Sequence, residues 1–105
     1  MSKLRWLGTS HEDLSAFPEA ARCEAGHQLW QVEIGLDPDD WKPMPSIGQG
    51  VREIRVREAN GAFRVIYVTN IDEHVYVLHA FQKKTRSTPK RDLELARRRL
   101  QELRQ

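Results

Sequence analysis

The stretch VREIRVREANGAFRVIYVTNIDEHVYVLHAF (residues 51–81) decides the fold. In residues 51–58 apolar and charged side chains alternate, as they do in a strand with one buried face. Ile54 and Val56 share the apolar face, and the opposite face carries Glu53, Arg55 and Arg57. This pattern predicts a β-strand with a charged outer surface.

Two further strands are predicted within the same stretch. Asn60-Gly61 is the strongest short hairpin signal in the chain. Residues 63–69 are rich in β-branched and aromatic side chains on both faces, as in a central strand. The polar residues 70–73 predict a second turn, and residues 75–81 predict a third strand. We therefore expect three strands that form an antiparallel meander.

Helical signals precede the predicted sheet. Thr9 and Glu12 have the spacing of a capping box, which predicts a first short helix. Pro18 either kinks this helix or begins a second one, and we expect helical structure over residues 19–34. Recurring prolines in residues 37–45 predict a loop, because proline interrupts both helices and hydrogen-bonded ladders.

A last helix is predicted after the sheet. Thr88 can cap this helix, with Pro89 at its first position. An apolar stripe then repeats at helical spacing through Leu93, Ala96, Leu100 and Leu103. The predicted fold class is therefore α+β, with helices first, an antiparallel sheet and one closing helix.

Length and composition indicate a globular protein. The chain has 105 residues, of which 39% are hydrophobic and 30% charged, and we expect one domain over residues 1–105. No apolar run reaches the roughly 18 residues that a membrane helix requires, and Met1 is not followed by the apolar segment of a signal peptide. The one cysteine, Cys23, excludes an internal disulfide and fits a cytoplasmic protein. We interpret it as a packing residue.

The charges are distributed unevenly along the chain. Residues 83–105 hold nine Lys or Arg and three Asp or Glu, whereas residues 1–82 hold eight and twelve. Such asymmetry favours a polyanion or an acidic protein as partner, and a solvated helix face is the alternative. Lys90 and Arg91 favour the first interpretation, because the helix dipole disfavours cations in the first turn of a helix.

Three arginines are expected to gather on the sheet. Arg55 and Arg57 share one strand face, and the predicted hairpin brings Arg64 beside them. Like charges on neighbouring strands repel each other unless an anion lies between them, and arginine suits bidentate binding of phosphate. In the alternative, Arg55 and Arg57 pair with Glu53, Glu58 or other acidic residues.

His79 stands in the third predicted strand, shortly before Lys83 and Lys84. Histidine suits acid–base catalysis near neutral pH, although a lone strand histidine is more often a hydrogen-bonded structural residue. The other histidines show no ligand spacing, and the acidic run at residues 37–40 lacks the rest of a calcium loop. We expect neither a metal nor a cofactor.

Several segments together resemble a known family. They are DLSAFPEAAR (13–22), KPMPSIGQGVREIRVRE (42–58), FRVIYV (63–68) and LHAFQKKTRSTPKRDLELARRR (78–99). The chain is similar to the phage-related HigB-like branch of the RelE/ParE toxin superfamily. This resemblance implies two N-terminal helices packed on a twisted antiparallel sheet, as in RelE-like proteins.

The resemblance also implies a function. It indicates the toxin of a bacterial type II toxin–antitoxin module, a cytoplasmic endoribonuclease that cuts mRNA, often on the ribosome, without a metal. Its partner would be a helix-turn-helix antitoxin of the HigA-like kind. In such an enzyme Arg64 would clamp phosphate, Arg55 and Arg57 would hold the RNA backbone or assist deprotonation, and Lys83 and Lys84 would stabilise the leaving group.

Further residues complete the expected site. His79 is a candidate acid or base by its position, and additional phosphate contacts are assigned to Arg86, Lys90 and Arg91. Some RelE-like ribonucleases carry a tyrosine near the C-terminus, whereas no tyrosine follows Tyr76 here. The resemblance therefore leaves the identity of the general acid and base open.

Two other functions remain open at this point. A ParE-like inhibitor of DNA gyrase would bind a protein and cut no RNA. A non-catalytic basic module would bind RNA or an acidic antitoxin segment, with affinity that falls as salt rises. Because members of one superfamily share a fold, the fold alone does not separate these functions.

Overall fold

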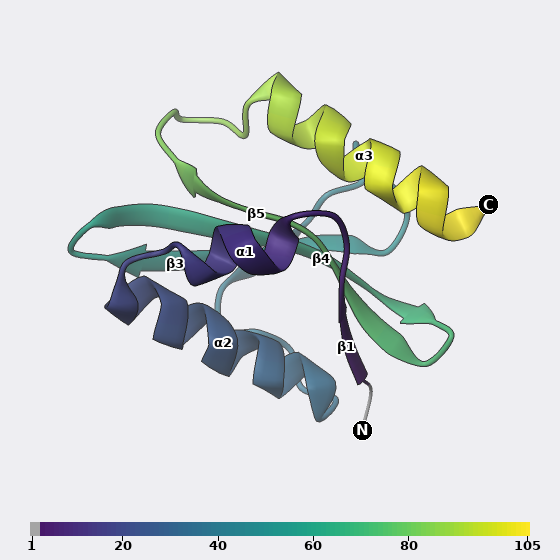
Figure 1. The fold of residues 1–105 in the computed structure, drawn as a ribbon, viewed down its shortest axis with the longest axis horizontal. Coiled ribbons are helices and arrows are strands. Elements are labelled where there is room, and N and C mark those ends of the chain that lie inside the picture. The colour runs from purple at the N-terminus through teal and green to yellow at the C-terminus, as the bar shows by residue number, and fades with distance from the viewer. Residues whose placement is uncertain (1–2) are drawn as a thin grey trace.

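The computed structural model describes residues 3–105, which form a five-stranded sheet with helices on both of its faces (Figure 1). Along the chain the elements are β1 (Lys3–Trp6), α1 (Ser10–Ser15), α2 (Glu19–Glu33), β2 (Trp41–Pro43), β3 (Val51–Glu58), β4 (Gly61–Ile71), β5 (His74–Lys83) and α3 (Lys90–Arg104). The strand order in the sheet is β1-β5-β4-β3-β2.

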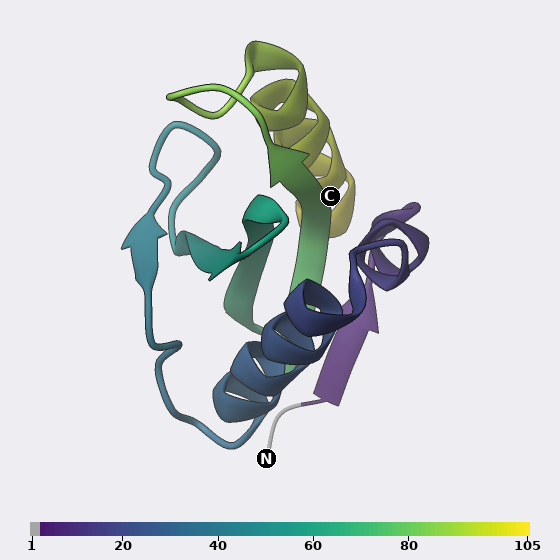
Figure 2. The same cartoon turned by 90° about the vertical axis from the view of Figure 1, so that its left-hand side faces the viewer.

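The helices cover opposite faces of the sheet. Helices α1 and α2 lie on one side and α3 on the other (Figures 1 and 2). Two apolar clusters follow from this arrangement. The α1 and α2 side buries residues that include Phe17, Leu29, Ile54, Val65 and Tyr67. The α3 side buries Met44, Ile47, Val51, Ile66, Val68, Leu78, Ala96 and Leu100.

The predicted meander of three strands is confirmed. β3 and β4 pair antiparallel across the turn at Asn60, with Glu58 opposite Gly61. β4 and β5 pair antiparallel across a turn whose Asp72 and Glu73 adopt positive φ. β4 is buried along most of its length because it lies in the middle of the sheet, between β3 and β5.

The predicted fold class was wrong about the sheet, which is mixed rather than antiparallel. β1 precedes both N-terminal helices and pairs parallel with β5, with Lys3 beside His74 and Trp6 beside Val77. β1 has only four residues, too few for its alternation to stand out in the sequence. Its position follows from packing, because Leu4 and Trp6 lie against the cluster beneath α1 and α2.

A second correction concerns the proline-rich loop predicted over residues 37–45. Residues 41–43 form the edge strand β2, antiparallel to β3, with Trp41 opposite Ile54. Pro43 is tolerated there because an edge strand has one side that carries no ladder hydrogen bonds. The sheet therefore has two short edge strands beside the predicted meander.

The helix bounds are close to the expected ones, but three local interpretations were wrong. Thr9 makes no capping hydrogen bond, and its hydroxyl donates to Asp13 instead. Helix α3 begins at Lys90, with Pro89 as its N-cap, so Thr88 does not cap it. Cys23 is exposed and is not a packing residue. Among the described residues, no helix has the length and apolar character needed to span a membrane.

Candidate functional site

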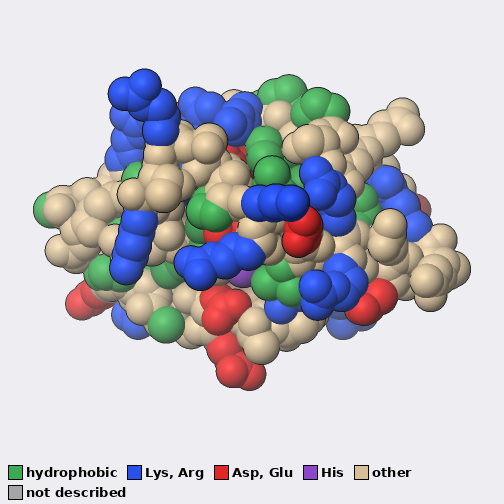
Figure 3. All heavy atoms as spheres, turned by 90° about the horizontal axis from the view of Figure 1, so that it is seen from above, with side chains coloured by type: hydrophobic (Ala, Val, Ile, Leu, Met, Phe, Trp, Pro, Cys, Tyr) green, Lys and Arg blue, Asp and Glu red, His purple; other side chains and the backbone are tan. Residues whose placement is uncertain are grey.

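Basic side chains gather on the α3 face, the surface of the sheet on which α3 packs (Figure 3). The strand register accounts for part of this cluster. Arg55 of β3 lies directly opposite Arg64 of β4, and Arg64 lies opposite Phe81, two residues before Lys83 on β5. Because side chains alternate along a strand, Arg55, Arg64 and Lys83 point to the same face. Three of the predicted site residues are thus brought together.

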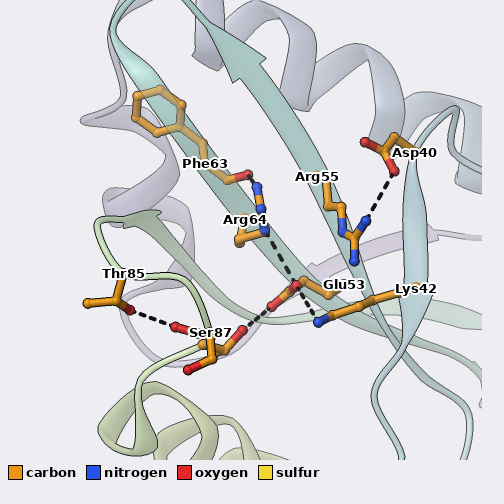
Figure 4. A network of polar contacts seen from close by, with 9 residues as sticks. Asp40, Lys42, Glu53, Arg55, Phe63, Arg64, Thr85 and Ser87 are labelled. Carbon is orange, nitrogen blue, oxygen red and sulfur yellow. Dashed lines mark hydrogen bonds and ion pairs between the residues drawn. The ribbon is translucent and has the colours of Figure 1, made fainter.

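A buried carboxylate lies among these cations (Figure 4). Glu53 on β3 is 0% exposed, and its Oε1 lies 3.4 Å from Arg64 Nε and 4.0 Å from Lys42 Nζ on β2. Its Oε2 accepts a hydrogen bond of 2.8 Å from the Thr88 hydroxyl. Two cations and a hydroxyl therefore surround one carboxylate, which offsets the cost of burying its charge.

Arg64 is almost wholly buried, at 4% exposed. Its Nη1 donates a hydrogen bond of 3.0 Å to the Phe63 carbonyl. Its Nε faces Glu53 but has no hydrogen-bond partner within residues 3–105. Burial lowers the pKa of the Arg64 guanidinium, Glu53 opposes that change, and Arg55 and Arg57 add to it. Arg64 still remains a cation, because arginine does not lose its proton in proteins.

Lys83 ends β5 beside these arginines and is half-buried. Burial lowers the pKa of the Lys83 ammonium, and the nearby Arg64 lowers it further. Lys83 therefore adds a third positive charge to the cluster formed by Arg55 and Arg64.

Arg55 and Arg57 differ in their surroundings. Arg55 Nη1 lies 3.9 Å from Asp40 Oδ1, and Arg55 Nε is buried without a hydrogen-bond partner in the described part of the chain. Arg57 is exposed at the end of β3. Arg55 thus forms a long ion pair with Asp40, which is the alternative expected for this residue in its weakest form. Glu53 does not pair with Arg55 but with Arg64 and Lys42.

The remaining basic candidates lie on the surface next to Lys83. Lys84 and Arg86 are exposed in the basic loop, which we define as residues 84–89 between β5 and α3. Lys90 and Arg91 are exposed in the first turn of α3, where Lys90 Nζ lies 3.8 Å from Glu94 Oε1. These side chains can be reached by a ligand as large as a nucleic acid.

His79 is separated from the basic cluster by its contacts. The imidazole is 6% exposed, and its Nε2 lies 2.7 Å from Asp92 Oδ1 on α3. It also stacks on Phe81, with ring centroids 5.1 Å apart. Its Nδ1 has no hydrogen-bond partner within residues 3–105. These contacts match the structural role that is usual for a strand histidine.

Sequence reasoning missed three residues of this network. Glu53 was recognised only as a possible partner of Arg55 and Arg57, although its alternation with them placed it on their face. Thr88 was read as a helix cap, and nothing in the sequence links it to a carboxylate 35 positions away. Lys42 was assigned to a loop.

In the described residues, no group of three or more His, Cys, Asp or Glu side chains is arranged to hold a metal.

Comparison with known families gives one decisive match. The family model described as phage derived protein Gp49-like (DUF891) matches residues 12–101. The chain belongs to the Gp49-like family. The Gp49-like family is associated with toxins of toxin–antitoxin systems, which agrees with the class of protein indicated by the sequence. A comparison with curated proteins gives no match.

Proposed function

We propose that this Gp49-like protein is a HigB-like toxin of a type II toxin–antitoxin system and that it cleaves mRNA on the ribosome. The proposal is supported by its family and, above all, by one observation. Arg55, Arg64 and Lys83 converge on one face of the sheet. Such a cluster suits a phosphodiester substrate and a reaction driven by protein cations.

The proposed reaction uses the neighbouring hydroxyl of the RNA. The 2′-hydroxyl loses a proton while its oxygen forms a bond to phosphorus, and the bond between phosphorus and the 5′-oxygen breaks. The products are a 2′,3′-cyclic phosphate and a 5′-hydroxyl, which takes up a proton. The enzyme must stabilise the extra charge on phosphate and move both protons.

The side chains divide these tasks by position. Arg55 stabilises the charge that develops on the phosphate, and the exposed Arg57 holds the RNA backbone. The buried Arg64 adds positive potential beneath the phosphate without contacting the RNA. Lys83 ends β5 on the same face as Arg64, where its ammonium can supply the proton that the leaving oxygen takes up. Lys84, Arg86, Lys90 and Arg91 bind flanking phosphates. His79 contributes by supporting α3, since its Nε2 is already bonded to Asp92.

The proposed partner is a helix-turn-helix antitoxin of the HigA-like kind. An exposed cluster of cations attracts an acidic protein segment and speeds its association. An antitoxin that covers this cluster would block RNA binding and so neutralise the toxin.

The test is brief induction of the protein in bacteria, followed by mapping of RNA 5′ ends. Lys83→Gln is the informative variant, because it removes a cation without leaving Glu53 unpaired. Arg22→Gln, an exposed position on α2, is the control. New 5′ ends inside translated codons, lost in Lys83→Gln and kept in Arg22→Gln, support the proposal. Growth arrest with intact transcripts contradicts it and indicates a protein target such as gyrase.

A further inference from the structure

The basic loop is tied to the sheet by a single side-chain hydrogen bond. The Thr88 hydroxyl donates to Glu53 Oε2 over 2.8 Å. The other hydroxyl contact of this segment stays inside it, since Thr85 Oγ1 donates to the Ser87 carbonyl over 2.6 Å. Among the described residues, Thr88 is therefore the side chain through which the loop is held against β3.

The acceptor of this bond is a buried carboxylate. Glu53 is wholly buried in β3, and its Oε1 lies at ion-pair distance from Arg64 and Lys42 without a hydrogen-bond partner within residues 3–105. A hydrogen bond to an ionised carboxylate is shorter and stronger than one between neutral groups. The hydrogen bond to this buried carboxylate therefore restricts the position of the Thr88 side chain. The position of Thr88 is thus set by the residues of the candidate site itself.

A second contact holds the chain just beyond the loop. Asp92, in the first turn of α3, is bonded to His79 on β5 over 2.7 Å. Lys83 marks the other end of the loop, because it is still paired with Ala62 in the sheet. The loop is therefore held at Lys83, Thr88 and Asp92, and the span between the first two carries Lys84 and Arg86.

We propose that the hydrogen bond between Thr88 and Glu53 is a latch that positions Lys84 and Arg86 for binding of the RNA backbone. This inference rests on the proposed function. Thr88 is a positioning residue, which acts through the loop and not on the reacting atoms. The same carboxylate that holds Arg64 also holds the loop, so one residue coordinates two parts of the RNA-binding surface.

The experiment compares three variants of the full chain. Thr88→Val keeps the shape of the side chain and removes the hydroxyl. Thr88→Ser keeps the hydroxyl and serves as the conservative rescue. Thr85→Val is the matched control, because it removes a hydroxyl of the same loop that does not reach the sheet. Thermal unfolding of each variant shows whether the fold is retained, and Thr88→Ala replaces Thr88→Val if that variant fails to fold.

The first readout is limited digestion of the folded protein by trypsin, which cuts after Lys84 and Arg86 once the loop is released. We expect cleavage at these two bonds to be about tenfold faster in Thr88→Val than in the wild type, because the variant loses one net hydrogen bond. The cleavage rate should be unchanged in Thr85→Val and Thr88→Ser. Equal cleavage in Thr88→Val and the wild type overturns the latch. This readout does not depend on ribonuclease activity.

The second readout is RNA binding and cleavage. We expect Thr88→Val to raise KM several-fold and to change kcat less, because the loop contacts flanking phosphates. If the wild-type protein shows no ribonuclease activity, the proposed function is wrong. The trypsin digestion still tests the hydrogen bond between Thr88 and Glu53 in that case. A released loop together with an unchanged KM overturns the positioning role and leaves the proposed function in place.

Discussion

His79 Nε2 lies 2.7 Å from Asp92 Oδ1, and this contact joins the last long strand to the first turn of α3. Both side chains are buried. The carboxylate also lies near the N-terminus of the helix, where negative charge is favoured. The pair therefore fixes the place at which α3 begins, and with it the point at which the basic loop enters the helix.

Loss of this contact should lower stability more than loss of an exposed ion pair on the same helix. Asp92→Ala leaves a buried imidazole nitrogen without its partner, and we expect the free energy of unfolding to fall by about 1–3 kcal/mol. Glu94→Ala removes only the exposed pair with Lys90 and should cost less than about 0.5 kcal/mol. Urea denaturation measures both. Equal losses would contradict the structural role of His79 and Asp92.

Two glycines should respond in opposite directions to alanine. Gly8 has φ +54°, and an added Cβ would lie 2.5 Å from Arg99 Nε. Arg99 in turn donates to the Leu78 carbonyl, so it cannot move without loosening α3. We expect Gly8→Ala to lower the free energy of unfolding by roughly 1–3 kcal/mol.

The matched variant is Gly26→Ala, in the middle of α2. An added Cβ at this position meets no atom within 4 Å. Alanine favours the helix more than glycine does, so stability should rise by roughly 0.5–1 kcal/mol. Thermal unfolding measures both variants, and a destabilised Gly26→Ala would show that the outer face of α2 is less open than the structure indicates.

The charged ammonium of Lys83 should lower the free energy of unfolding at neutral pH. Its pKa in the folded protein is lowered, chiefly by burial, so folding weakens proton binding at this group. The penalty is fully present below the folded pKa and disappears as the pH rises through that value toward the ordinary 10.5. We expect Lys83→Met to be more stable than the wild type at neutral pH and equally stable in strong alkali. Denaturation across this pH range measures the effect, with Lys84→Met as control. The same pH dependence of stability in both variants would disprove the expectation.

Tyr67 should make the protein sensitive to alkali. Burial raises the pKa of its phenol above the ordinary 10.0, and Arg52 opposes the change. The stability that depends on the neutral phenol is complete below the unfolded pKa and is lost as the pH rises through the folded pKa. Tyr67→Phe should remove this loss above pH 10.

At neutral pH the same variant should change stability by less than about 1 kcal/mol, since the buried Tyr67 hydroxyl has no hydrogen-bond partner in residues 3–105. Fluorescence-monitored unfolding on both sides of pH 10 measures these effects. An alkaline transition that is identical in the wild type and in Tyr67→Phe would assign the sensitivity to another group.

The sequence was most informative where contacts are local. Alternation in residues 51–58 and the turn at Asn60-Gly61 were enough to predict that Arg64 lies close to Arg55 and Arg57, and the structure pairs Arg64 with Arg55. Contacts between distant segments left no comparable signal. The parallel pairing of β1 with β5 depends on how the helices and strands between them pack. The hydrogen bond from Thr88 to Glu53 depends on the path of the basic loop over the sheet. Such contacts are set by packing in three dimensions and not by spacing along the chain.

The parallel strand β1 also has a consequence for the order of folding. Lys3 pairs with His74, so β1 can join the sheet only after β5 has been made. Contacts between segments so distant in sequence form slowly, because the intervening chain must first be ordered. The sheet is completed only after β5 has left the exit tunnel, and α3 closes over it later still. The face of the sheet that carries Arg55, Arg64 and Lys83 is therefore complete only after β5 has been made and α3 has packed on it.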